Sequence, residues 1–167
     1  AAAAQIPPGS DGLTVLPHFA GTASPSFNPH ARGAVVGLTL GHGRAHIARA
    51  IMESCACLLR ELVGIIRDRG IAVERVRSLG GAARSDLWLQ IKADMLGLPV
   101  ERPACPDAAS LGAAMLAAVG TGQFASVTEA AAAWYRPQMT FEPDPKQWDI
   151  YEEVYARYVA LCERLYQ

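Results

Sequence analysis

No stretch of this 167-residue chain is apolar over the roughly 20 residues that a membrane-spanning helix needs. An excess of charge is also missing, because 15 Lys and Arg residues against 16 Asp and Glu residues leave a formal net charge of −1. The alanine run at residues 1–4 has no basic region before it and is not typical of a secretory signal. We therefore expect neither a nucleic-acid partner nor a membrane partner.

Cysteine is scarce, with four in the chain: Cys55, Cys57, Cys105 and Cys162. The first two fall inside a predicted helix, where side chains two residues apart diverge, so their spacing suits neither a disulfide nor a zinc site. His42 and His46 are four residues apart, but no third ligand stands at a suitable spacing, which favours capping or buried histidines over a metal site. Unpaired cysteines are typical of a reducing compartment, so we expect a cytoplasmic protein.

What the chain does have is the composition of an ordinary globular domain, with 51% hydrophobic and 19% charged residues. Apolar residues at intervals of three or four predict helices at residues 44–69, 86–96, 108–119, 126–134 and 144–166. Asp107 is a good N-cap for the third of these, and Gly97 ends the second. Short apolar runs predict strands at residues 13–16, 33–40, 73–79 and 100–102.

The order of these elements indicates the fold class. Strands alternate with helices after residue 33, which is typical of a mainly parallel, layered α/β sheet. Three short strands make a narrow sheet for so many helices, so we expect the chain to lack part of its sheet. Residues 1–8 are predicted to be a disordered or linker-like segment, and residues 9–167 to form the domain.

Gly80 and Gly81 are the most informative residues of the chain. They end an apolar strand and precede the helix that begins near Asp86. Bare backbone at such a turn lets a flat ligand lie close to the chain. The residues alone leave two interpretations open: a ligand site, or a packing turn in which Ser85 is the N-cap of the helix.

Two carboxylates in the predicted helices receive structural interpretations. Glu53, in the middle of the longest helix, is interpreted as a buried structural carboxylate. Asp86, in the first turn of its helix, is interpreted as a partner of the helix dipole.

Several segments in the same order resemble the FGGY carbohydrate kinases, the family of xylulose, ribulose, gluconate and glycerol kinases. Residues 33–38 (GAVVGL), followed seven residues later by residues 46–53 (HIARAIME), resemble the second signature of that family. Residues 79–88 (LGGAARSDLW) look like its adenosine motif, and residues 109–114 (ASLGAA) look like its last inter-domain helix. The resemblance covers nearly all of residues 9–166.

The resemblance implies an α/β fold, the C-terminal domain of an actin-like ATPase (ribonuclease H-like) sugar kinase that lacks its first strands. It implies an ATP-dependent kinase in which Mg²⁺ bridges the phosphates and the γ-phosphoryl group passes to a hydroxyl of a sugar or polyol. It places the nucleotide at Gly80, Gly81, Ala82 and Ser85 and assigns this chain no catalytic residue. The sugar and the catalytic base are implied to lie mainly on an N-terminal domain.

The resemblance also implies that the chain is a C-terminal fragment, inactive by itself, which dimerises or aggregates through its incomplete sheet edge. The alternative is a non-catalytic actin-like domain that serves nucleotide binding or subunit assembly. Xylulose kinases typically have Gly-Glu-Arg-Thr-Pro where residues 21–25 read GTASP, and this departure weakens a xylulose assignment. Which sugar is phosphorylated stays open.

Overall fold

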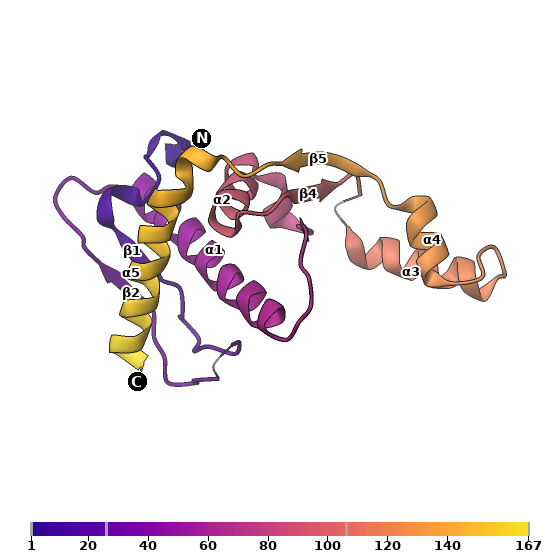
Figure 1. Cartoon of the computed structure of the whole chain (residues 1–167), viewed down its shortest axis with the longest axis horizontal. Coiled ribbons are helices and arrows are strands. Elements are labelled where there is room, and N and C mark those ends of the chain that lie inside the picture. Colours follow the sequence, from indigo (N-terminus) through magenta and orange to yellow (C-terminus); the bar gives the residue numbers. More distant parts are fainter. Residues whose placement is uncertain (1, 26, 106, 167) are drawn as a thin grey trace.

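The computed structural model describes residues 2–25, 27–105 and 107–166 (Figure 1). Its helices are α1 (Arg44–Asp68), α2 (Asp86–Leu96), α3 (Ala108–Gly120), α4 (Val127–Trp134) and α5 (Trp148–Tyr166). Its strands are β1 (Thr14–Leu16), β2 (Ala34–Val36), β3 (Val76–Arg77), β4 (Val100–Pro103) and β5 (Pro137–Phe141). Short 3₁₀ helices are η1 (Ala2–Gln5), η2 (Ser10–Gly12), η3 (Gly81–Arg84) and η4 (Pro145–Gln147). Within these described residues, no helix is both long and apolar enough to cross a membrane.

The strands form two small sheets, and the expectation of one mainly parallel sheet is wrong. In the first sheet β1 pairs with β2 in the antiparallel sense. In the second sheet β3 pairs with β4 in parallel, while β5 pairs with the other edge of β4 in the antiparallel sense. The sequence did not predict β5 because all but the last of its residues are exposed, so it has no alternation of buried and exposed positions.

Helices α1, α2 and α5 pack together and enclose the main core. The buried side chains of this cluster include Ile91 and Met95 from α2 and Tyr151 and Tyr158 from α5. Each large side chain that is fully removed from water contributes roughly 1.5–3 kcal/mol, so this cluster is a major source of the stability of the body. The hairpin of α3 and α4 extends away from the body and is joined to it through β4 and β5 (Figure 1).

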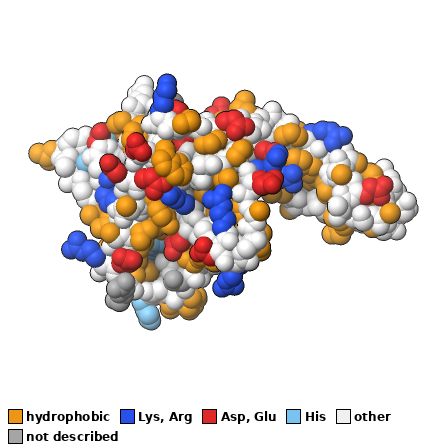
Figure 2. All heavy atoms as spheres, in the orientation of Figure 1, with side chains coloured by type: hydrophobic (Ala, Val, Ile, Leu, Met, Phe, Trp, Pro, Cys, Tyr) orange, Lys and Arg blue, Asp and Glu red, His pale blue; other side chains and the backbone are white. Residues whose placement is uncertain are grey.

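The charged side chains of the body are mixed in sign. Figure 2 shows Lys and Arg interspersed with Asp and Glu across the visible face. This distribution agrees with the near-zero net charge of the sequence.

The helix boundaries follow the capping residues, and the strands are shorter than predicted. The side-chain oxygens of Ser85 and Asp107 accept hydrogen bonds from the backbone N–H groups of Trp88 and Ser110, at 3.3 and 3.1 Å. The predicted strand at residues 33–40 ends early because Gly37 adopts a φ of +85° and turns the backbone away. A Cβ at Gly37 would lie 2.7 Å from the carbonyl oxygen of Gly12, so only glycine allows this close approach.

Residues 2–8 pack against the body of the protein, whereas residues 1–8 were predicted to be disordered or linker-like. Ala3 in η1 is buried, and Arg49 Nη1 donates a hydrogen bond to the carbonyl oxygen of Ile6 at 2.8 Å. The carboxylate of Glu53 accepts hydrogen bonds from the N–H of Gly9 (2.9 Å) and from the hydroxyl of Ser10 (2.8 Å). These bonds hold the segment against α1. The structural interpretation of Glu53 is confirmed.

Candidate functional site

The parallel strands β3 and β4 bring two separate segments of the chain to one edge of the sheet. The ladder between them has two backbone hydrogen bonds. The N–H of Val76 donates to the carbonyl oxygen of Pro99 at 2.9 Å, and the N–H of Ser78 donates to the carbonyl oxygen of Glu101 at 2.9 Å. Beyond this edge, the segment that follows β3 enters η3 and α2, and the segment that follows β4 enters α3. In open α/β sheets, ligands bind outside the carboxyl ends of the strands.

The turn at Gly80 requires glycine for backbone reasons. Its φ of 75° and ψ of −162° lie in a region that is essentially restricted to glycine. This conformation reverses the chain into η3, whose Ala83 is fully buried and anchors the turn against the body. The exposed side of η3 therefore faces away from the sheet.

At Gly81 the backbone conformation does not require glycine. Its φ is not positive, and a Cβ built on it would meet no described protein atom within 4 Å. Packing within the described chain therefore does not explain a glycine at this position. The backbone at Gly81 faces open space, as a ligand-contacting glycine would.

A hollow of about 490 Å³ lies between η3 and the beginning of α3. Its described lining residues are Leu79, Gly80, Gly81, Arg84, Asp107, Ala108 and Ala109. Its volume is within the range of about 300–1,000 Å³ that is usual for small-molecule sites. Of the four residues predicted to bind nucleotide, Gly80 and Gly81 line this hollow.

The other two predicted residues lie beside the hollow. Ala82 and Ser85 are half-buried and do not line it. The hydroxyl oxygen of Ser85 accepts a hydrogen bond from the N–H of Trp88, so the N-cap interpretation is confirmed for this residue. A hydroxyl that accepts this bond keeps its own proton for a second partner.

The sequence did not predict the opposite wall of the hollow. Asp107 was expected only as the N-cap of a helix, and no pattern linked residues 107–109 to the glycine turn. Arg84 also lines the hollow, at three residues from Gly81. In a 3₁₀ helix, residues three apart lie directly above one another, so this spacing was a signal that sequence reasoning missed.

Asp107 stays ionised at the start of α3. Its carboxylate accepts bonds from the N–H and the hydroxyl of Ser110, at 3.1 and 2.9 Å. These hydrogen bonds lower the pKa of the carboxyl group below its usual value, with the backbone N–H as the largest cause. The end of α3 nearest the hollow therefore carries a negative charge.

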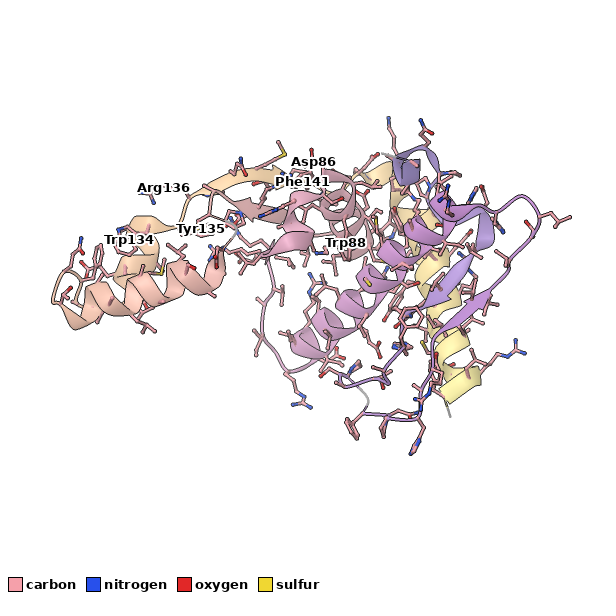
Figure 3. All side chains as sticks on the ribbon, turned by 180° about the vertical axis from the view of Figure 1, so that it is seen from behind. Asp86, Trp88, Trp134, Tyr135, Arg136 and Phe141 are labelled. Atoms are coloured by element: carbon pink, nitrogen blue, oxygen red, sulfur yellow. The ribbon has the colours of Figure 1, made fainter. Side chains whose placement is uncertain are left out.

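A buried carboxylate on β4 holds the three-stranded sheet together. Glu101 on β4 accepts hydrogen bonds from Arg75 Nη1 (2.7 Å), Arg77 Nε (3.2 Å) and the hydroxyl of Tyr135 (2.8 Å). Tyr135, labelled in Figure 3, caps the end of α4. The bond from Tyr135 is the largest cause that lowers the pKa of Glu101, and burial opposes it. Glu101 thus joins β3 and the α4–β5 junction to β4.

Asp86 has a partner beyond the helix dipole. It pairs with Arg102 of β4, and the guanidinium carbon of Arg102 lies 5.3 Å from the centre of the Phe141 ring of β5. Asp86 and Phe141 lie close together in Figure 3. The pair therefore joins the first turn of α2 to the sheet, which sequence reasoning did not predict.

Residues 1–121 match the sequence profile described as "FGGY family of carbohydrate kinases, C-terminal domain". The chain belongs to this family. Glycerol kinase from Bordetella parapertussis is 46% identical over 135 residues, which cover 80% of this chain and 26% of that protein. Glycerol kinase from Aromatoleum aromaticum is 41% identical over 165 residues, which cover 98% of this chain and 33% of that protein. This FGGY chain thus spans about a quarter to a third of the length of these curated relatives.

Solved FGGY kinases share the fold of the chain. Xylulose kinase from Rhodospirillum rubrum superposes with a TM-score of 0.84 at 36% identity, covering 98% of this chain and 33% of that one. Plasmodium falciparum glycerol kinase with ADP superposes with a TM-score of 0.76 at 27% identity, covering 95% of this chain and 31% of that one. The expected α/β, actin-like ATPase fold of a sugar kinase C-terminal domain is confirmed.

His42 and His46 of this FGGY domain both accept hydrogen bonds from backbone N–H groups, those of Thr39 and Gly43. His46 Nδ1 accepts a hydrogen bond from the N–H of Gly43 at 3.1 Å and so caps the start of α1, while its Nε2 lies 3.2 Å from Asp11 Oδ2. Among residues 2–25, 27–105 and 107–166, no group of three or more His, Cys, Asp or Glu side chains is placed to hold a metal ion.

A second hollow, of about 270 Å³, lies over α1 and α5, and its lining includes His18, Glu61 and Tyr158. Burial lowers the pKa of His18, so its imidazole is neutral near pH 7. Tyr158 Oη lies 3.5 Å from His18 Nε2. Its lining also includes Thr22, Ser24 and Pro25, which belong to the segment at residues 21–25 that departs from the pattern typical of xylulose kinases.

Proposed function

We propose that this chain is the ATP-binding C-terminal part of a carbohydrate kinase, which transfers the γ-phosphoryl group of ATP to a hydroxyl of a sugar or polyol. The observation that carries the proposal is the hollow at the glycine turn. It lies beyond the carboxyl ends of two parallel strands, and its wall includes a glycine whose missing Cβ would meet no described atom. Membership of a kinase family supplies the class of ligand.

We place the adenine against Gly80 and Gly81, with Ala82 and Ser85 beside it. The free space at Gly81 fits a flat ring that lies on bare backbone, because any side chain there would occupy that space. The hydroxyl proton of Ser85 is available for the ribose or the base, since its oxygen already serves as the helix cap.

The remaining partners follow from the same proposal. Mg²⁺ would enter bound to the phosphates, where it neutralises charge during transfer. The sugar or polyol would be held mainly by an N-terminal domain, and the chain itself carries no proposed catalytic residue. We further propose a cytoplasmic location, supported by the four free cysteine thiols, and association into a homodimer.

The proposal is tested by steady-state kinetics on Gly81→Val in the full-length protein. We expect the KM for ATP to rise at least tenfold, about 1.4 kcal/mol or more, while the KM for the acceptor is unchanged. Gly64→Val is the matched control, because a Cβ at Gly64 in α1 also meets no described atom. Ser85→Ala should have a smaller effect, about 1 kcal/mol, through its lost hydrogen bond.

The choice of acceptor and the alternative function are tested in the same assay. Glycerol and xylulose should be compared, because the two named glycerol kinases and the named xylulose kinase are all similar to this chain. A folded Gly81→Val protein with an unchanged KM for ATP would show that the nucleotide does not lie on the backbone at Gly81. A full-length protein that binds ATP but forms no sugar phosphate would indicate the non-catalytic actin-like domain.

A further inference from the structure

Among the described residues that line the hollow, Arg84 is the one on the η3 wall that has a charged side chain. The other residues of that wall are Leu79, Gly80 and Gly81, which are neutral. Arg84 is exposed, and no hydrogen bond or ion pair joins its side chain to another described residue. An arginine without a protein partner beside a ligand-sized hollow is free to contact the ligand.

The 3₁₀ geometry of η3 sets where Arg84 lies. Residues three apart in such a helix are eclipsed, so the side chain of Arg84 emerges directly alongside the bare backbone of Gly81. Buried Ala83 fixes η3 against the body. Gly81 and Arg84, on either side of it in the sequence, therefore stay on the side of η3 that faces the hollow. The guanidinium is therefore held next to the surface on which the adenine is proposed to lie.

The charge at the opposite wall indicates which part of a nucleotide Arg84 meets. The carboxylate of Asp107 is ionised, and it already accepts a hydrogen bond from the N–H group of Ser110 at the start of α3. An anion at that helix end repels phosphate and leaves a less favourable phosphate site there. The neutral base, and not the phosphates, is thus expected between η3 and α3.

We propose that Arg84 stacks its planar guanidinium on the face of the adenine and so determines the affinity of this hollow for adenine nucleotides. This inference rests on the proposed nucleotide function and adds a residue to that site. A guanidinium over an aromatic face is attracted both by the ring quadrupole and by stacking, whereas the compact lysine ammonium is strongly hydrated and cannot stack. The two cations therefore differ at a stacking site.

The test measures dissociation constants for adenosine and for ADP by isothermal titration calorimetry, on the full-length protein. Arg84→Ala should weaken the binding of both ligands by the same factor, about two- to fivefold, because the contact is with the base. Arg84→Lys should restore little of that loss. Arg164→Ala is the matched control, since Arg164 is also exposed and α5 ends on the far side of the molecule from the hollow (Figure 1).

Other results would overturn the inference in distinct ways. A loss for ADP but not for adenosine, restored by Arg84→Lys, would make Arg84 a phosphate ligand. Unchanged binding in Arg84→Ala, with Gly81→Val still weakening ADP, would remove Arg84 from the site and leave the proposed function standing. If Gly81→Val also leaves binding unchanged, or if the wild-type protein binds neither ligand, the proposed function fails as well.

Discussion

Tyr135 donates its phenolic proton to Glu101 across 2.8 Å, and this bond joins the end of the α3–α4 hairpin to the central strand of the three-stranded sheet. The two residues are 34 positions apart in the chain. Glu101 also lies next in the ladder to Ser78, where the chain leaves the sheet for the glycine turn. The stability of the candidate site therefore depends on this carboxylate.

We expect Glu101→Gln to destabilise the protein by about 1–2 kcal/mol near pH 7, because it removes charge-assisted bonds while keeping the shape. The pKa of Glu101 is lowered in the folded state. Its contribution is therefore present above the unfolded-state pKa of about 4.3 and is lost as the pH falls through the lower folded-state pKa. Urea unfolding at pH 7 and at low pH measures this, and a difference between the two proteins that does not shrink in acid would contradict the expectation.

Glu53→Ala should destabilise the protein by about 3–5 kcal/mol, because it leaves Arg49 as an uncompensated buried charge. The two side chains are joined at 2.8 Å, and their exposed fractions are only 2% for Glu53 and 6% for Arg49. The free energy of unfolding from urea titration is the measurement. Glu74→Ala, at an exposed position, is the control and should change the free energy by no more than about 0.5 kcal/mol.

Gly80→Ala and Gly81→Ala should differ in stability although they are neighbours. Gly80→Ala forces a Cβ into a glycine-only conformation and should cost about 1–3 kcal/mol. Gly81→Ala should be nearly neutral, because its backbone is ordinary and its Cβ meets no described atom. Thermal unfolding followed by circular dichroism compares them, and equal losses in both variants would argue against the two separate roles.

Exposed apolar side chains on and after β2 predict that the chain associates with itself. Val35 is 49% exposed, Leu38 60% and Leu40 fully exposed, and among the described residues β2 pairs only with β1. Sedimentation velocity should show concentration-dependent association, which Leu38→Asp with Leu40→Asp should reduce. Ile71→Asp, at another exposed apolar position, should leave it unchanged. A monomer at every concentration would contradict this prediction.

The sequence by itself predicted features that depend on neighbours along the chain. The bounds of α2 were predicted at residues 86–96 because Ser85 caps one end and Gly97, with a φ of +61°, closes the other. The cap at Asp107 was predicted on the same local grounds. Capping and periodicity act over three or four residues, so the local sequence carries the whole signal.

The tertiary structure decided the features that join distant segments. It added β5, whose exposed residues gain their hydrogen bonds only by pairing with β4. It brought Asp107 to face Gly81, and it gave Glu53 its contacts with Gly9 and Ser10. No periodic pattern in the sequence encodes such long-range contacts, because they depend on how the helices and strands pack against one another. The glycine turn could thus be located in the sequence, but the hollow that it borders could not.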